Sequence, residues 1–386
     1  MDVKSFGEKS NGKLVKNEDG YFTFVPNPLP PKINYDDNEF GMLLSNAHNS
    51  LGTLAGIGQL LSNPHLLILP YIKREAVLSS RIEGTQASLS DLFLYEAIKK
   101  EPKEFKRLRE VRNYVYTATK AMTQMKKGNK ITLNLIRLLH KQLLYKVRGE
   151  DRTPGEFRKI QNWIGRPGCP IEDATFVPPC AKELPEVLSR LEDFISTPTP
   201  SIPLLVKTAL IHYQFESIHP FVDGNGRIGR LLIVLFLCEC RALPQPLLYL
   251  SAFFEKNKGE YYDKLLRASV EGDIEGWIKF FLRSVEVQSK ETIQNVQEMI
   301  KLQRTYEKRL RKIKATINAN RLLYSLFLNP YTTISNTKKY LNVTFPTAKK
   351  SIETLEKVEI LKEFSERKRN RVYYAEDLLE IFHARD

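Results

Sequence analysis

Apolar residues recur every three or four positions along most of this chain, which places them on one face of an α-helix. From Glu39 onward this spacing predicts a mainly α-helical protein. The predicted helices cover residues 39–56, 63–84, 88–99, 105–126, 131–146, 184–195, 203–216, 226–240, 258–269 and 274–317. Pro70 is expected to interrupt the second of these helices, because proline has no amide hydrogen to continue the hydrogen-bond ladder.

Two segments ahead of residue 180 depart from the helical pattern. Residues 1–40 are rich in Asn, Gly and Pro, and they predict an extended lead-in with a short strand at 21–25. Residues 149–179 are rich in Gly and Pro. Within them, the segment from Ile171 to Val177 is predicted to form a small β-hairpin flap.

The C-terminal part of the chain has shorter elements than the rest. Its pattern predicts three short helices and then two extended pieces, at residues 321–328, 333–340, 345–358, 360–364 and 371–375. Three short helices followed by a two-stranded wing are typical of a winged helix-turn-helix domain.

Charge is concentrated in the same C-terminal part. The chain carries a net charge of +14. Residues 301–386 contain 19 Lys and Arg against 10 Asp and Glu, a surplus of nine positive charges. Such a surplus favours an anionic partner such as DNA, although a solvated basic face would have the same composition.

Composition also indicates where the chain works. The longest apolar run, residues 231–238, is far shorter than the roughly 20 residues of a membrane span. The four cysteines have no C-x-x-C spacing, which argues against a zinc site. We therefore expect a cytoplasmic protein with reduced thiols that does not enter a membrane.

One twelve-residue segment concentrates chemically useful side chains, and its sequence is His219-Pro220-Phe221-Val222-Asp223-Gly224-Asn225-Gly226-Arg227-Ile228-Gly229-Arg230. Its Gly-Asn-Gly triplet predicts a turn that opens a helix, where free backbone N–H groups can hold an anion. Arg227 and Arg230 are three residues apart and share a helix face, and their guanidinium groups suit phosphate oxygens.

The same segment supplies a metal ligand and a base. The carboxylate of Asp223 can hold Mg²⁺ that bridges phosphates. The imidazole of His219 can accept a proton near neutral pH. A helix N-terminus with surface arginines would explain each feature alone. The combination predicts phosphoryl or nucleotidyl transfer.

The segment matches HxFx(D/E)GNGRxxR at every specified position, so the chain resembles the Fic family. The likeness extends over about residues 20–285. It includes PLPP in the lead-in, EFRKIQNWIG at 156–165, VPP at 177–179 and SAFFEKNKGEYYDKL at 251–265.

The resemblance implies a role for each residue of the segment. His219 would deprotonate a Tyr, Thr or Ser hydroxyl of a target protein, and Asp223 would bind Mg²⁺. The ligands of the ATP phosphates would be Gly224, Asn225, Gly226, Arg227 and Arg230. AMP would pass to the target and pyrophosphate would leave. Doc-type relatives carry a lysine at position 226 and phosphorylate instead, so the glycine here favours AMP transfer, while phosphocholine and UMP transfer stay open.

A second motif lies upstream. Ser79, Glu83 and Gly84 match the pattern (S/T)xxxE(G/N), the inhibitory motif of Fic enzymes. Alone, this pattern also fits an ordinary helix that ends at a glycine. In a Fic-like chain it implies that Glu83 pairs with Arg230 and occupies the cation meant for the γ-phosphate.

Two further features fit the family. Tyr261 and Tyr262 follow the main motif at the distance where Fic enzymes present aromatic rings to the adenine, although two half-buried helix tyrosines would have the same pattern. The flap from Ile171 to Val177 corresponds to the segment that docks the target chain by adding a strand.

The expected organisation follows from these motifs. It is an N-terminal helical region with the inhibitory helix (1–115), a Fic catalytic core (116–285), a connecting helix (286–318) and a winged helix-turn-helix domain (319–386). The expected function is an adenylyltransferase that uses ATP and Mg²⁺ to modify a protein, which includes the chain itself. Two alternatives stay open, a hydrolase that removes AMP and a DNA-binding regulator whose core senses nucleotide. The C-terminal domain is expected to contact DNA, a protein partner or a second copy in a homodimer.

Overall fold

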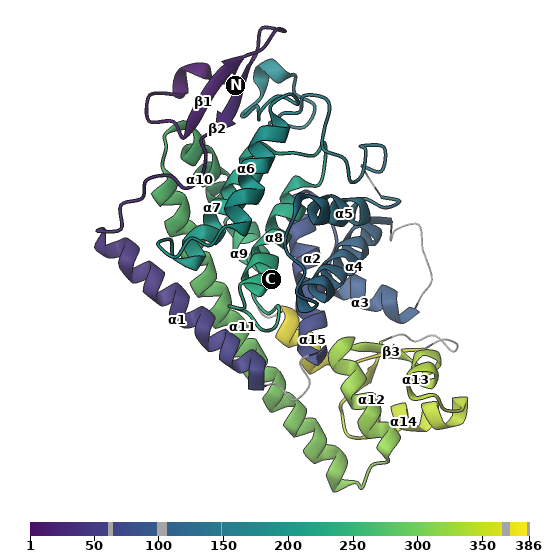
Figure 1. The fold of residues 1–386 in the computed structure, drawn as a ribbon. Helices are drawn as coiled ribbons and strands as arrows, with labels where there is room; N and C mark the ends of the chain where they lie inside the picture. The colour runs from purple at the N-terminus through teal and green to yellow at the C-terminus, as the bar shows by residue number, and fades with distance from the viewer. Residues whose placement is uncertain (61–64, 99–105, 148, 365–370, 384–386) are drawn as a thin grey trace.

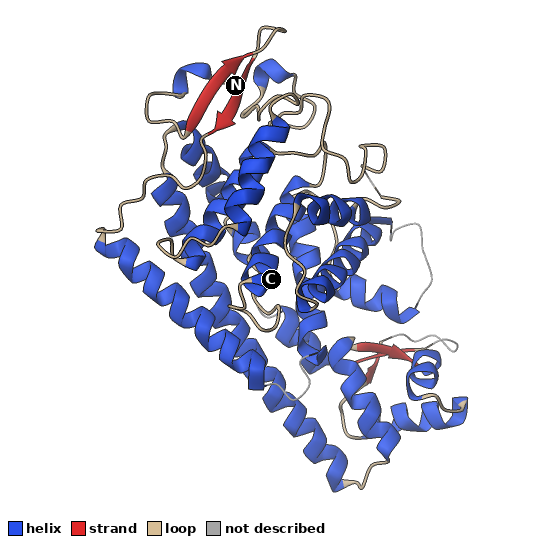
Figure 2. Ribbon diagram, viewed as in Figure 1, coloured by secondary structure: helices blue, strands red, loops and turns tan. Residues whose placement is uncertain are grey.

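The chain forms a helical body with one small antiparallel sheet at each of two opposite ends (Figures 1 and 2). This computed structural model describes residues 1–60, 65–98, 106–147, 149–364 and 371–383. The predicted fold class, mainly α with small β elements, is confirmed. Among the helices built from described residues, none is both long and apolar enough to cross a membrane.

The N-terminal sheet is a hairpin of β1 (Gly12–Lys16) and β2 (Phe22–Pro26), which follows a 3₁₀ turn, η1 (Val3–Ser5). The strand predicted at 21–25 is therefore confirmed, and its partner β1 was not predicted. Phe24 is buried at the centre of this sheet, and its amide donates to the carbonyl of Val177 at 2.8 Å. This bond attaches the hairpin to the segment that precedes α6.

One side of the body is a pair of long helices. α11 (Ile274–Lys312) has 39 residues, and α1 (Asn38–Leu60) packs along it (Figure 1). The prediction of a single helix over 274–317 was wrong at its C-terminal end. Lys314 has a φ of 49°, and Thr316 caps the following helix by accepting a hydrogen bond from the Ala319 amide.

The remaining helices of the body surround two central ones, α7 (Leu204–Ile218) and α8 (Asn225–Glu239). Their bounds are α2 (His65–Ile82), α3 (Leu89–Ile98), α4 (Lys106–Lys126), α5 (Leu133–Leu143), α6 (Leu184–Ser196), α9 (Ser251–Lys256) and α10 (Lys258–Val270). Nearly every side chain of α7 and α8 is buried, so both are core helices. The loop between them is thus anchored at both ends.

Two further sequence predictions about elements were wrong. α2 continues through Pro70 without a break, although the missing amide of this proline removes one hydrogen bond inside the helix. The first residues of the helix predicted at 63–84 lie outside the described residues. The segment from Ile171 to Val177 is not a hairpin of two strands: it contains the 3₁₀ turn η3 (Ile171–Asp173) and one β-bridge, from Phe176 to Ile164.

The C-terminal module, residues 317–383, contains seven elements in the order helix, strand, two helices, two strands, helix. They are α12 (Ile317–Leu328), β3 (Tyr331–Thr333), α13 (Ile334–Leu341), α14 (Phe345–Lys357), β4 (Lys362–Glu363), β5 (Val372–Tyr374) and α15 (Glu376–His383). β5 is the central strand, antiparallel to both β3 and β4. The strand β3 and the final helix were not predicted, and the winged helix itself stays a prediction.

The C-terminal module is attached to α2 and α3. Lys73 of α2 pairs with Glu96 of α3 at 2.6 Å and also donates to the carbonyl of Leu328 at 3.2 Å. Asn329 donates to the carbonyl of Phe93 at 2.9 Å. These contacts join the start of the module to α2 and α3, and the module therefore packs against the helix that ends directly before Glu83 (Figure 1).

Candidate functional site

The loop between α7 and α8 carries the main motif and has a fixed shape. His219 ends α7 in the left-handed region, with a φ of 48°, and Gly224 has a φ of 83°. Phe221 is fully buried between these two turns and stacks on the ring of His140 at a centroid distance of 3.7 Å. The buried ring anchors the loop, so the polar residues on either side of it have defined positions.

Asn225 holds this loop closed. Its Oδ1 accepts from the Phe221 amide and its Nδ2 donates to the Phe221 carbonyl, both at 2.8 Å. The side chain is 2% exposed. The side chain of Asn225 thus holds the loop, and Asn225 as a phosphate ligand stays a prediction. Its backbone N–H in the first turn of α8 remains a donor for an anion.

His219 is poised as a base. Its Nδ1 lies 3.3 Å from the carbonyl oxygen of Glu216. A carbonyl only accepts, so this nitrogen carries the hydrogen and Nε2 keeps a free lone pair. Burial, with a smaller contribution from the charge of Arg158, lowers the pKa of His219 to about 4 against the opposing effects of the Glu216 carbonyl and the carboxylates of Glu83 and Asp223. The imidazole is neutral at physiological pH.

Arg227 lies beneath the loop and is 1% exposed. Its Nη2 donates to Oδ1 of Asp223 at 3.1 Å, and its Nη1 lies 3.9 Å from Oε2 of Glu110. Its Nε and Nη1 have no hydrogen-bond acceptor within the part of the chain that the structure describes. Buried N–H groups of this kind normally have a partner, so this guanidinium fits a missing anion.

Arg230 and Glu83 form the ion pair that the inhibitory motif predicts. Arg230 Nη2 donates to Glu83 Oε1 at 2.7 Å. The same arginine donates through Nε to the Ser79 hydroxyl at 2.8 Å and through Nη2 to the Ser79 carbonyl at 2.9 Å. Burial alone would raise the pKa of Glu83, but the charge and the hydrogen bond of Arg230 outweigh it and lower that pKa. The carboxylate is therefore ionised.

The position of Glu83 requires the glycine at 226. A Cβ on Gly226 would lie 2.2 Å from Oε1 of Glu83 and 2.8 Å from Nη1 of Arg230. The carboxylate thus rests on the first turn of α8, where the helix dipole favours negative charge. Gly84, directly after it, has a φ of 90°, which terminates the inhibitory helix. Glu83 occupies the place where this helix N-terminus would receive a phosphate.

Asp223 fits a magnesium ion that is bound together with a nucleotide. Its side chain is 29% exposed, and a single carboxylate with phosphate oxygens and waters is a usual ligand set for Mg²⁺. No group of three or more His, Cys, Asp or Glu side chains suited to a metal occurs among the described residues. The site is therefore incomplete as a metal site without the phosphates of a substrate.

The two tyrosines differ in accessibility. Tyr261 is 1% exposed, stacks on Phe254 at 4.5 Å and lies with its hydroxyl 2.8 Å from Nε2 of His212. The prediction that Tyr261 contacts the adenine is therefore corrected, because this ring belongs to the aromatic core. Tyr262 is 42% exposed and remains available to a ligand.

Two residues that shape the site were not identified from the sequence. His140 of α5 has its Nε2 2.8 Å from the Asp223 carbonyl oxygen. Its Nδ1 accepts a hydrogen bond from the Gly155 amide at 2.9 Å. Arg158 donates to the carbonyls of His219, Ile218 and Pro179, and so joins the end of α7 to the flap segment. Histidine and arginine are common on amphipathic segments, so the sequence pattern alone does not identify either residue as part of the site.

Glu216 is a third unpredicted residue. Burial raises its pKa to about 8, against the opposing charge of Arg230, so the carboxyl group is protonated at neutral pH. It approaches α8 at Gly229, where a Cβ would lie 2.1 Å from its Oε1. Because Glu216 is neutral, Glu83 supplies the negative charge that faces Arg230.

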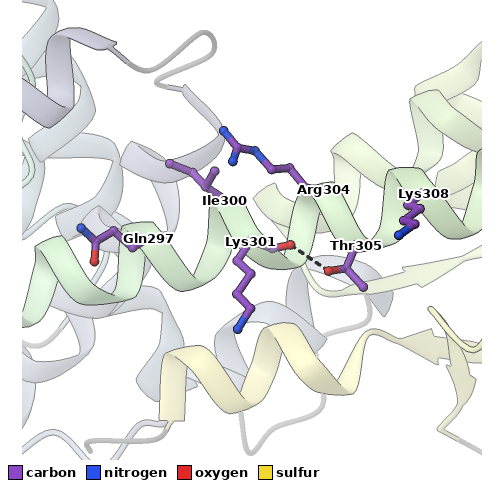
Figure 3. A pocket seen from close by; sticks show the side chains of 6 residues that line it. All are labelled: Gln297, Ile300, Lys301, Arg304, Thr305 and Lys308. Carbon is purple, nitrogen blue, oxygen red and sulfur yellow. Dashed lines mark hydrogen bonds between the residues drawn. The ribbon is translucent and has the colours of Figure 1, made fainter.

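A separate cavity of about 450 Å³ lies beside α11, away from this motif (Figure 3). Its lining residues are Gln297, Ile300, Lys301, Arg304, Thr305 and Lys308. None of these residues belongs to either motif. The candidate functional site is therefore the place where the two motifs meet, at the loop between α7 and α8 and at the end of α2.

Known proteins share both parts of the site. The Fic/DOC family N-terminal model matches residues 42–123, and the Fic/DOC family model matches residues 130–237. The protein adenylyltransferase Fic of Drosophila willistoni is 31% identical over 157 residues, which cover 40% of this chain and 28% of that protein. The protein of the same name from Culex quinquefasciatus is 31% identical over 165 residues, 42% of this chain and 29% of that protein. The chain thus matches less than a third of the length of these curated relatives.

Solved structures extend the likeness in fold. A Fic family protein from Desulfovibrio desulfuricans G20 aligns with a TM-score of 0.57 and 19% identity, covering 90% of this chain and 98% of that one. Fic-1 from C. elegans aligns with a TM-score of 0.50 and 19% identity, covering 67% of this chain and 74% of that one. Both motifs lie within the matched segments, and the chain contains the N-terminal and Fic domains of the Fic/DOC family.

Proposed function

We propose that this protein is an adenylyltransferase that transfers AMP from ATP to a hydroxyl side chain of a protein and is inhibited by its own Glu83. One observation carries the proposal. Arg227 is buried at the N-terminus of α8, in the same motif as the neutral His219, and its Nε and Nη1 have no acceptor among the described residues. The names of the relatives from Drosophila and Culex support the same activity.

The chain's own residues account for the proposed reaction. Nε2 of His219 accepts the proton of the target hydroxyl, whose oxygen forms a bond to the α-phosphorus. The bond from that phosphorus to the bridging oxygen breaks, and pyrophosphate leaves. Arg227, Arg230 and the first amides of α8 bind the phosphates and orient them in line with the attacking oxygen. Mg²⁺ held by Asp223 would neutralise phosphate charge.

Glu83 inhibits this reaction by occupying an anion site. Its carboxylate pairs with Arg230 and rests on Gly226, both of which are proposed ligands of the triphosphate. A bound γ-phosphate and an ionised Glu83 would compete for one guanidinium and repel each other. The triphosphate then binds in a pose that misaligns its α-phosphorus.

The target protein is proposed to dock on the segment from Ile171 to Val177. Beside its one β-bridge, this segment leaves the carbonyls of Ala174 and Thr175 without a hydrogen-bond partner among the described residues, which suits the addition of an extended peptide. Arg158 connects it to the His219 backbone, so a docked chain would lie near the base.

Labelled-AMP incorporation tests the proposal. Wild type, Glu83→Gly and the double variant Glu83→Gly/His219→Ala are incubated with ATP, Mg²⁺ and candidate protein targets. Releasing a charge-assisted contact of about 1.5–3 kcal/mol should raise incorporation by roughly tenfold or more in Glu83→Gly. His219→Ala should lower that activity by about 10²–10⁴-fold without loss of ATP binding.

Three outcomes would contradict parts of the proposal. Equal incorporation by wild type and Glu83→Gly would remove the inhibitory role. Unchanged transfer in the double variant would remove His219 as the base. If wild type releases AMP from a modified protein and Glu83→Gly does not, the enzyme is a hydrolase in which Glu83 orients water.

We also propose that the C-terminal module binds DNA. Exposed lysines gather on its helices α13 and α14, at Lys338, Lys339, Lys349 and Lys350. The order of its elements is that of the predicted winged helix. This role is independent of AMP transfer and has its own test below.

A further inference from the structure

The segment directly after the inhibitory glutamate is attached to the phosphate-binding helix through α4. Thr85 is buried, and its hydroxyl donates to Oε2 of Glu110 at 2.8 Å. Its amide donates to the carbonyl of Ser80 at 2.9 Å, which completes the C-terminal cap of the inhibitory helix. A movement of Glu83 away from Arg230 would therefore pull on Glu110.

The same carboxylate oxygen of Glu110 faces Arg227. The distance from Oε2 to Arg227 Nη1 is 3.9 Å, and the two side chains are 12% and 1% exposed. Solvent screens a pair of this burial weakly. The charge of Glu110 thus faces the side of Arg227 that Asp223 does not bond, because Asp223 accepts from Nη2 while Nε and Nη1 have no acceptor among the described residues.

We propose that Glu110 is a second inhibitory carboxylate, which joins the end of the inhibitory helix to Arg227. With Glu83 on Arg230 and Glu110 on Arg227, each of the two proposed phosphate-binding arginines faces a carboxylate that a nucleotide must outcompete. Because Thr85 bonds to Glu110, release of Glu83 from Arg230 weakens the contact of Glu110 with Arg227, and the reverse also holds. This inference rests on the proposed function, since it concerns the regulation of the same site.

Two variants separate the charge of Glu110 from the hydrogen bond that Thr85 donates to it. Glu110→Gln keeps an oxygen that can accept from Thr85 but removes the charge that faces Arg227. Thr85→Val removes the hydroxyl and keeps the charge. Thr117→Val is the matched control, because Thr117 is a buried threonine of α4 whose hydroxyl has no partner among the described residues.

Three measurements are made on the full chain: calorimetric binding of Mg-ATP, hydrogen exchange of residues 79–87, and labelled-AMP incorporation. Coupling between two sites commonly changes affinity by about 5- to 150-fold. Glu110→Gln should bind Mg-ATP at least about fivefold more tightly. In Thr85→Val, the amide hydrogens of residues 79–87 should exchange faster and AMP incorporation should rise. Thr117→Val should match wild type in all three measurements.

The design separates this inference from the proposed function. If Glu83→Gly incorporates no AMP, the proposed function fails, while ATP binding and exchange still test Glu110. Unchanged or weaker ATP binding by Glu110→Gln overturns the inference. Unchanged hydrogen exchange of residues 79–87 in Thr85→Val also overturns the inference. If Glu110→Gln loses thermal stability and gains no ATP affinity, Glu110 is only a structural partner of Thr85, and the inference fails.

Discussion

The imidazole of His219 shows how one residue obtains its chemistry from its surroundings. A solvent-exposed histidine has a pKa near 6.5. Burial lowers the pKa of His219 to about 4, and the Glu216 carbonyl fixes the hydrogen on Nδ1. The result is an imidazole that is neutral and has a fixed orientation over the whole physiological range of pH, as the proposed base requires.

This pKa gives a testable pH profile. The active form of His219 is the neutral one, so transfer by Glu83→Gly should stay level from about pH 8 to about pH 5.5 and fall only as the pH approaches 4. The negative charge of Glu83 raises the pKa of His219, so its removal should move the acid limb further down. The measurement is kcat/KM against pH, with intrinsic fluorescence to confirm folding. A half-maximal rate near pH 6.5 in folded protein would contradict the profile.

At the scale of elements, α5 supports the loop between α7 and α8 although it carries none of the predicted site residues. His140 stacks on Phe221 and bonds at its two ring nitrogens to Asp223 and Gly155. Burial lowers the pKa of His140 to about 4, so it accepts from Gly155 and donates to Asp223 as a neutral ring. The loop between α7 and α8 therefore depends on a helix about 80 residues upstream.

His140→Phe should keep the stack and lose both hydrogen bonds. Leaving the Gly155 amide and the Asp223 carbonyl unpaired should cost about 1–3 kcal/mol for each buried group. We expect a lower melting temperature and reduced AMP transfer in the Glu83→Gly background, because Asp223 is no longer held. The control is His48→Phe, at a histidine of α1 whose Nδ1 lies near the Leu44 carbonyl. Equal stability and transfer for the two variants would show that α5 does not position the loop.

At the scale of the whole molecule, the C-terminal module is part of the same packed body as the helices that carry the two motifs. It contacts α2 and α3 through Lys73 and Asn329, and Asp377 of α15 accepts from Tyr306 of α11 at 2.9 Å. These contacts favour experiments on the full chain over experiments on an isolated fragment.

DNA binding by the full chain should depend strongly on salt. If the four exposed lysines of α13 and α14 neutralise phosphates, affinity for duplex DNA should fall by roughly a hundredfold between 50 and 200 mM salt. Lys350→Glu should weaken DNA binding and reduce the dependence of affinity on salt concentration. Lys159→Glu changes an exposed lysine outside the C-terminal module and should do neither. The measurement is fluorescence anisotropy with labelled genomic fragments. Binding that is absent at low salt would favour a protein partner for the module.

Local chemistry explains why so much of the site was predictable. The residues from His219 to Arg230 are adjacent in sequence, so turn and helix preferences alone place their backbone and their shared face. Ser79 and Glu83 are one helical turn apart, and the family pattern linked them to Arg230. Helix periodicity likewise located the helices of the body to within a few residues, apart from short ones such as α9.

Long-range packing decided the rest. Glu110, His140 and Arg158 lie in separate segments, and no local pattern reports which loop their side chains reach. Burial separated Tyr261 from Tyr262, two neighbours of the same residue type, because one faces the aromatic core and the other faces solvent. The sequence by itself determined the chemical groups and the local shape of the loop. Only the tertiary structure decided which charges are desolvated, which donors lack acceptors and which pKa values shift, because these depend on distances between residues far apart in the chain.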